Sequence, residues 1–327
     1  MKSALGRALQ FFLLMVFTIF CVVACGNNSP KTTLVSSSLP ASEYRVVNHA
    51  MGATKVPLNP QRIVTLDGSA IENVLALGSK PVGTVLNGSL EEQPAFLREN
   101  LADTTFVGSF EQPNLERILA LKPDLILGDQ GISENIYPQL SQIAPTVLAQ
   151  YKGSDRWKQM LQIHAAALGK SEAAEQIINK YYARLAQFKA QMGDRLPETE
   201  VSVARIYPQG IGLYQKESFS GSILADAGLP RPESQRQEVV QQQISKERIL
   251  DADGDVIFLW SYSDDYRGDP QDRQTIEQKL KADLLWLKLK AVQQGKVYEV
   301  PDYWIGFGPL AADAVVNDLF KYLVNTP

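Results

Sequence analysis

The sequence LERILALKPDLIL, residues 115–127, has the pattern of a short helix followed by a buried β-strand. A second copy, KERILDADGDVIF, occupies residues 246–258. The four residues Glu-Arg-Ile-Leu stand at 116–119 and again at 247–250, an offset of 131 residues (247 − 116). A repeat that keeps its frame over this distance predicts two lobes of similar construction.

Other residues repeat at the same offset. Asp124 in the first copy corresponds to Asp255 in the second, and each helix follows a residue that favours helix N-termini, Asn114 or Ser245. At a larger offset of 149 residues (224 − 75), the segment LALGSKP, residues 75–81, is echoed by LADAGLP at 224–230. The repeat therefore extends well beyond four residues.

Strand-like apolar runs alternate with helical stretches on both sides of a long helical region. Runs such as Arg62–Leu66 and Val201–Tyr207 are typical of parallel strands covered on both faces. We expect an α/β protein with two similar lobes, mainly parallel sheets and one long linking helix from Ser171 to Met192. The predicted domains are a first lobe at 44–154, a helical segment at 155–193 and a second lobe at 194–327.

The first residues have the character of an export signal. Lys2 and Arg7 precede an apolar run that ends at the sequence VVACG, residues 22–26, which resembles a bacterial lipoprotein box. This resemblance implies a signal peptide at 1–24, lipid on Cys25 and a polar tether at 25–43, with the protein anchored on the periplasmic side of a bacterial membrane. A plain cleaved signal and an uncleaved membrane anchor are the alternatives.

Composition excludes several classes of protein. The net charge of −4 and the pI of about 5.4 argue against a nucleic-acid partner. Two His and two Cys are too few for a usual side-chain metal site, and both Cys lie in the leader, so we expect no disulfide. We expect a monomer.

Three stretches carry a family resemblance: residues 49–83, VGSFEQPNLERILALKPDLILGD at 107–129, and VYEVPDYWIGFGPLAADAVVNDL at 297–319. The chain resembles the substrate-binding proteins of ABC transporters, in the class that binds ferric siderophores, haem and cobalamin. The resemblance implies a non-enzymatic protein that binds a ferric siderophore, needs no cofactor of its own and delivers its ligand to a permease dimer.

The resemblance also assigns a role to the repeated acids. In this family one exposed acidic residue on each lobe docks on permease arginines, and these positions fall on Glu116 and Glu247. The alternative is that both residues only favour a helix N-terminus through its dipole, a contribution of about 0.3–1 kcal/mol. We expect Arg117 and Arg248 to be solvated or paired locally.

The ligand is expected between the lobes, where open α/β sheets bind at the carboxyl ends of their strands. Arg205 is the strongest candidate, because a single arginine that ends an apolar strand is difficult to explain as a surface residue, and a guanidinium recognises carboxylates well. The other predicted ligand-binding residues follow strand ends or supply aromatic surface: Asp67, Ser109, Tyr207, Tyr214, Trp260, Tyr303 and Trp304.

The nature of the ligand stays open at this point. A single arginine favours a hydroxamate or citrate-hydroxamate siderophore over a highly charged catecholate, with haem or cobalamin as the alternative. An enzyme such as a hydrolase or chelatase is disfavoured by the lack of a G-x-S-x-G motif. The sequence GFGPLA at 306–311 imitates a dinucleotide fingerprint, but no second strand can follow it. The helix that it begins can face an anionic ligand instead.

Overall fold

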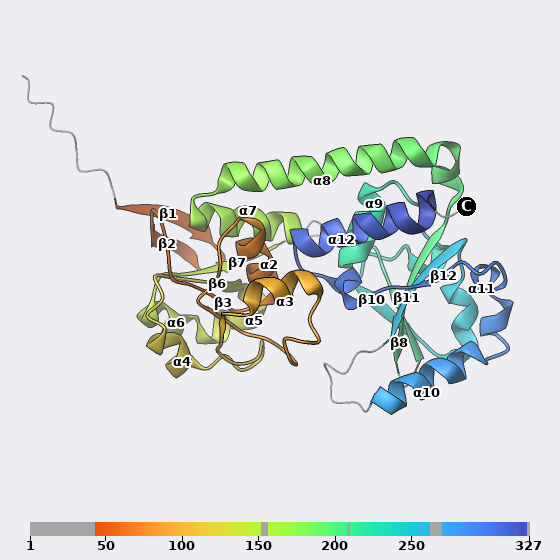
Figure 1. The fold of residues 1–327 in the computed structure, drawn as a ribbon, viewed down its shortest axis with the longest axis horizontal. Helices are drawn as coiled ribbons and strands as arrows, with labels where there is room; N and C mark the ends of the chain where they lie inside the picture. The colour runs from red at the N-terminus through yellow and green to blue at the C-terminus, as the bar shows by residue number, and fades with distance from the viewer. Residues whose placement is uncertain (1–42, 152–155, 208–209, 262–269, 326–327) are drawn as a thin grey trace, which may run out of the picture. The chain divides into compact units, whose positions relative to one another are not determined.

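The computed structural model describes residues 43–151, 156–207, 210–261 and 270–325. These residues form two α/β lobes, each built around a five-stranded sheet (Figure 1). The predicted fold class is therefore confirmed.

The sheet of the first lobe has the order β5-β4-β3-β6-β7, and all of its strands are parallel. Its strands are β3 (Ile63–Thr65), β4 (Gly83–Thr84), β5 (Thr105–Phe106), β6 (Leu125–Asp129) and β7 (Thr146–Ala149). The helices are α2 (Gly68–Ala76), α3 (Ala95–Leu101), α4 (Leu115–Ala120), α5 (Gln130–Ser133) and α6 (Tyr137–Ile143), with a 3₁₀ turn η1 (Glu134–Ile136). Every residue of β6 is buried, as expected for a central parallel strand with helices on both faces.

The sheet of the second lobe is mixed, with the order β10-β9-β8-β11-β12. Strands β8, β11 and β12 are parallel, whereas β9 and β10 are antiparallel additions at one edge. The strands are β8 (Val201–Tyr207), β9 (Gly210–Tyr214), β10 (Gln241–Ile244), β11 (Val256–Ser261) and β12 (Val297–Glu299). The parallel character predicted for this lobe thus holds for three strands, because a short connection between β8 and β9 forces an antiparallel pair.

Helices of several lengths complete the second lobe. They are α9 (Phe219–Asp226), α10 (Pro270–Lys281), α11 (Lys290–Gln293) and α12 (Pro309–Leu319), which continues into a π-helical turn η8 (Phe320–Val324). Short 3₁₀ segments are η2 (Gly193–Glu198), η3 (Glu233–Gln235), η4 (Lys246–Ala252), η6 (Trp286–Lys288) and η7 (Asp302–Ile305).

Two helices connect the lobes, α7 (Arg156–Leu168) and α8 (Ser171–Met192). Helix α8 packs along α7 and α12 (Figure 1) and has the bounds predicted for the linking helix. The predicted N-terminal β-pair is also present, as the antiparallel strands β1 (Tyr44–His49) and β2 (Gly52–Pro57). The two ring nitrogens of His49 bond Thr54 and backbone amides, so this histidine fastens the pair to the first lobe.

The two copies of the repeat differ in their helices. The first is the α-helix α4, and the Asn114 side chain accepts a hydrogen bond from the Arg117 backbone N–H at 2.9 Å. The second is the 3₁₀ segment η4, with non-helical backbone angles at Arg248, and the Ser245 side chain accepts no hydrogen bond from a helix N–H. Our prediction of a second capped α-helix was wrong, because the Ser245 hydroxyl bonds the Glu247 carboxylate instead and lowers the pKa of that acid.

The repeated aspartates have the same role in both lobes. Asp124 accepts hydrogen bonds from the backbone N–H groups of Gln61 and Arg62 at 2.7 and 2.9 Å, immediately before β3. Asp255 accepts from the N–H of Glu200 at 2.8 Å, immediately before β8. In each lobe the aspartate therefore joins the starts of the two central strands. These bonds explain why this position repeats independently of any docking role.

Among the described residues, no helix is both long enough and apolar enough to cross a bilayer. The predicted signal peptide, lipidated Cys25 and tether lie outside the described residues.

Candidate functional site

A cavity of about 650 Å³ lies between the lobes, where the carboxyl ends of several strands meet. We call it the large cavity. Its lining from the first lobe follows β3, β4, β5 and β6: Gly68, Ile71, Glu72, Leu86, Asn87, Gln93, Pro94, Phe96, Leu97, Phe110, Glu111, Gly131 and Ile132. The second lobe contributes Arg205, Asp302, Tyr303, Ile305, Gly306, Phe307 and Ala311. This is the place at which open α/β sheets bind ligands.

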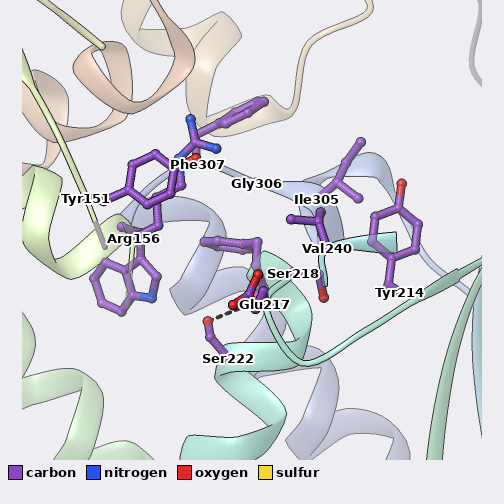
Figure 2. Close-up of a pocket in the computed structure, with 12 residues that line it drawn as sticks. Tyr151, Arg156, Tyr214, Glu217, Ser218, Ser222, Val240, Ile305, Gly306 and Phe307 are labelled. Carbon is purple, nitrogen blue, oxygen red and sulfur yellow. Dashed lines mark hydrogen bonds between the residues drawn. The ribbon is translucent and has the colours of Figure 1, made fainter. Parts of the chain in front are cut away.

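A second cavity of about 250 Å³ shares the segment Ile305–Phe307 with the large cavity. We call it the small cavity. Figure 2 shows Tyr151 and Arg156 on one side of it and Tyr214 on the other. The remaining lining residues are Trp157, Glu217, Ser218, Phe219, Ser222 and Val240. The segment Ile305–Phe307 therefore forms part of the lining of both cavities.

Arg205 is held in place by two tyrosines. Its guanidinium carbon lies 5.0 Å from the centre of the Tyr207 ring, and it donates a hydrogen bond to the Tyr214 hydroxyl. Burial lowers the pKa of Arg205, but the bonds with the tyrosines outweigh burial and raise it above its ordinary value. The residue is 7% exposed and remains charged. A buried, oriented guanidinium at a cavity wall suits an anionic oxygen of a ligand.

The three tyrosines predicted to bind the ligand have different roles. Tyr207 does not line either cavity, and its hydroxyl accepts a bond from the Gln241 side chain at 3.0 Å, so it supports Arg205. Tyr214 lines the small cavity. Tyr303 lines the large cavity while its hydroxyl donates to Asp318 at 2.9 Å.

Trp260 and Trp304 line neither cavity, contrary to our prediction that they bind the ligand. Trp304 is 0% exposed, stacks on Phe258 with ring centres 4.2 Å apart and donates from Nε1 to Asp318 at 2.8 Å. Trp260 is 3% exposed and packs against the Tyr214 ring. Both indoles are part of a hydrophobic core, and the N–H of Trp304 has a buried partner there in Asp318.

This correction carries a stability prediction. Trp304→Ala is expected to lower the free energy of unfolding by about 3–5 kcal/mol, because removal of the indole leaves an empty space in the core of the second lobe. Trp304→Phe, which loses part of the ring and the N–H that bonds the Asp318 carboxylate, should cost about 2–3 kcal/mol. Urea unfolding measures both losses, and folded Trp304→Phe should bind ligand like the wild type. If the variants instead kept wild-type stability but lost ligand binding, Trp304 would be a ligand-binding residue, as first predicted.

Asp67 and Ser109 are also absent from both cavity linings. Asp67 is 2% exposed and caps α2, where its carboxylate accepts from the N–H groups of Ser69 and Ala70 at 2.8 and 3.0 Å. Burial raises the pKa of Asp67 to about 7. The Ser109 hydroxyl accepts from the Gln112 N–H at 3.2 Å and shapes the turn that places Glu111 in the large cavity. The side chains of both residues therefore stabilise the backbone nearby by accepting hydrogen bonds from its N–H groups.

Arg156 is a cavity residue that the sequence did not reveal. It begins α7, donates to the buried carboxylate of Asp129 at 2.7 Å and stacks over Tyr151, with 4.2 Å between its guanidinium carbon and the ring centre. A signal existed in principle, because Asp129 ends an apolar strand and its charge needs a partner. That partner lies 27 residues away along the chain, which is too far for pattern reasoning.

The helix that begins with GFGPLA does not offer a free anion site. The carboxylate of Glu72, on α2, accepts hydrogen bonds from the backbone N–H groups of Phe307 at 3.1 Å and Ala311 at 2.8 Å. The N-terminus of α12 therefore already binds a carboxylate of the protein itself, that of Glu72. Our suggestion that it faces an anionic ligand is corrected accordingly.

The repeated glutamates both lie at the surface. Glu116 and Glu247 are exposed, on α4 and η4 respectively. Their arginine neighbours have local partners, as predicted. Arg117 donates to the carbonyl of Phe106 at 3.3 Å, and Arg248 pairs with Asp251. The repeated leucines, 119 and 250, are exposed by 59% and 50%, whereas the isoleucines before them are fully buried.

The histidines do not form a metal centre. Among the described residues, no group of three or more His, Cys, Asp or Glu side chains is arranged to hold an ion. His164 is buried and bonds the Asn73 side chain at 2.9 Å, and burial lowers its pKa to about 4.

Several known proteins are similar to this chain in sequence. The family model for periplasmic binding proteins matches residues 63–304. The probable siderophore-binding lipoprotein YfiY of Bacillus subtilis is 35% identical over 96% of this chain and 98% of its own length. The Fe(3+)-citrate-binding protein YfmC of the same organism is 28% identical over 96% of each chain.

A solved structure agrees with these relatives. The crystal structure of Staphylococcus aureus SirA complexed with staphyloferrin B superposes with a TM-score of 0.75 at 31% identity, covering 85% of this chain and 98% of that one. The matches in sequence and in fold both extend over most of the chain. The chain belongs to the periplasmic binding protein family.

Proposed function

We propose that this protein binds a ferric siderophore between its lobes and delivers it to the permease of an iron ABC importer. The observation that carries the proposal is Arg205, a buried guanidinium that two tyrosines orient at the wall of the large cavity. The names of YfiY, YfmC and SirA, all similar over most of the chain, support the same class of ligand.

The charges of the two linings favour a ligand of low net charge. Among the lining residues that the structure describes, Arg205 and Arg156 are the cations, and the acids are Glu72, Glu111, Asp302 and Glu217. Highly anionic complexes such as ferric triscatecholates would meet these acids without enough compensating positive charge. The proposed ligand is therefore a ferric hydroxamate or citrate-hydroxamate, with one or two anionic oxygens opposite the arginines.

Haem is a weaker candidate. The linings contain no histidine, and the Tyr303 hydroxyl is already committed to Asp318. These residues offer poor axial ligands for haem iron.

Tryptophan fluorescence tests the proposal, because Trp157 lines the small cavity. The protein would be titrated with ferric citrate, a ferric trihydroxamate, a ferric citrate-hydroxamate, a ferric triscatecholate, haem and cobalamin. Saturable quenching is expected with the citrate-hydroxamate or trihydroxamate complexes. Tight binding of haem alone, or of none of the six, would refute the proposed ligand class.

Lipid anchoring through Cys25 belongs to the same proposal. A wild-type protein that is exported and acylated should fractionate with membranes and incorporate labelled palmitate. Cys25→Ser is expected to release nearly all of the protein into the soluble extracytoplasmic fraction, because two or three acyl chains provide the anchoring energy. Membrane retention of Cys25→Ser without label would favour an uncleaved anchor.

A further inference from the structure

Glu72 forms a contact between the lobes that the proposed function leaves unused. The residue lies on α2 of the first lobe and is 3% exposed. Its carboxylate accepts from the N–H groups of Phe307 and Ala311, and the N–H groups of Gly308 and Leu310 also stabilise its negative charge. All four donors belong to the start of α12 in the second lobe. A helix N-terminus favours an anion, and here the anion is part of the same chain.

Close packing surrounds this contact, which we call the interlobe clasp (Ser69 and Glu72 against Phe307, Gly308 and Ala311). A side chain at position 308 would place its Cβ 2.7 Å from the Cβ of Glu72, so only glycine fits. The Ser69 hydroxyl donates to the Phe307 carbonyl at 3.0 Å. The Gly-Phe-Gly motif thus serves a close approach of two lobes, and no nucleotide is needed to explain it.

The clasp forms part of the wall of the large cavity. Ile305, Gly306 and Phe307 wall both cavities, and Phe307 is the residue that Glu72 and Ser69 hold from the first lobe. Any change at Glu72 therefore moves a wall that both cavities share. Glu72 itself also lines the large cavity.

The ionisation of Glu72 is finely balanced. Burial raises the pKa of its carboxyl to about 7, against the lowering effect of the four backbone donors. The other titratable groups on α2 and its packing partners are engaged elsewhere. Asp67 caps α2, His164 on α7 bonds Asn73, and Asp313 and Asp318 on α12 bond Arg184 and the Trp304 indole.

We propose that Glu72 is a positioning residue for the ligand site, whose ionised carboxylate holds the Ile305–Gly308 wall against the first lobe and whose protonation loosens that wall and weakens ligand binding. A protonated carboxyl carries a hydrogen on one oxygen, and that oxygen then faces an N–H donor instead of accepting from it. The ligand-affinity part of this inference rests on the proposed function. The clasp itself does not.

Binding and stability respond to pH with opposite signs. Ligand affinity should fall as the pH drops from 8 to 6, because the clasp loses its negative charge. The folded-state pKa of Glu72, about 7, lies above the ordinary value of 4.5, so the folded state binds a proton that the unfolded state lacks between these values. The contribution of Glu72 to stability is therefore present at low pH and lost as the pH rises through 7. Weaker binding in acid would thus not be a sign of unfolding.

Amide hydrogen exchange of the full chain tests the clasp without any ligand. Protection of the Phe307 and Ala311 amides, corrected for intrinsic exchange rates, should fall about tenfold between pH 8 and pH 6 in the wild type. Glu72→Gln should show the low protection at both values. Asp67→Asn is the matched control, because it removes the buried carboxyl that precedes and caps α2 while leaving the pH-dependent protection of Phe307 and Ala311 in place.

Ligand titration at the same two pH values completes the test. Glu72→Gln should bind the ferric citrate-hydroxamate about tenfold more weakly than the wild type at pH 8 and equally at pH 6. If Glu72→Gln does not fold, Gly308→Ala disturbs the clasp from the other lobe and should give the same exchange pattern. Protection that is independent of both pH and Glu72 would overturn the inference. If protection titrates but no ferric complex binds, the clasp stands and the proposed ligand class fails.

Discussion

Arg205→Ala is expected to weaken binding of the ferric citrate-hydroxamate by about 100-fold. Hydrogen bonds to a charged group contribute about 1.5–3 kcal/mol, and each 1.4 kcal/mol changes a dissociation constant tenfold. The loss should fall at the upper end of that range, because Arg205 is buried and already oriented by Tyr207 and Tyr214 before ligand arrives. Fluorescence titration at fixed pH and ionic strength measures the change.

Two further variants separate charge from geometry. Arg205→Lys keeps the positive charge but not the planar fork, so it should recover only part of the affinity. Arg236→Ala is the control, because this arginine of the second lobe is exposed, pairs with Glu200 and lines neither cavity. If Arg205→Ala bound with wild-type affinity, the ligand would not contact this guanidinium, and the site would have to centre on Arg156 in the small cavity.

The double variant Glu116→Ala with Glu247→Ala is expected to reduce iron uptake to background while binding the ferric complex with unchanged affinity. Both acids are exposed and neither lines a cavity, so docking and ligand recognition are separable. Each single variant should retain intermediate uptake, because one lobe can still engage the permease. Uptake of radioactive iron in cells that depend on this protein measures the effect.

The matched control removes the same charge elsewhere. Glu175→Ala with Glu198→Ala takes two exposed acids from α8 and the η2 segment and should leave uptake intact. Wild-type uptake by the Glu116 and Glu247 double variant would mean that these residues serve only their local helix ends. Reduced ligand affinity in that variant would contradict their placement at the surface.

Much of the fold was predictable because it rests on local patterns. Continuous apolar runs mark β6 and β11, and Gly169 with Ser171 marks the start of α8. Strands β9 and β10 were missed. β10 is the run Gln-Gln-Gln-Ile, which has low strand propensity and is set by pairing with β9. The 3₁₀ form of η4 likewise depends on a side-chain bond between Ser245 and Glu247 that competes with capping.

The ligand site was predictable only in part. Arg205 carries a sequence signal because a charge at the end of an apolar strand needs an explanation. Trp304 was predicted as an aromatic residue beyond a strand end, but its indole N–H instead bonds Asp318, fourteen residues later and inside the same core. The joint wall at Phe307 depends on Glu72, which is 235 residues away and in the other lobe. Contacts over such separations exist only once both lobes have folded.

Each copy of the repeated segment contains both buried structural residues and exposed residues. Ile118 and Ile249 are fully buried, and Asp124 and Asp255 join the central strands, whereas the glutamates and leucines of each copy face solvent. The residues that stabilise the fold and the residues exposed to solvent thus occupy separate positions within one short motif. Mutations can rewrite the outward positions at little cost to folding. The exposed glutamates and leucines can therefore change between relatives without altering the buried isoleucines or the aspartates that join the central strands.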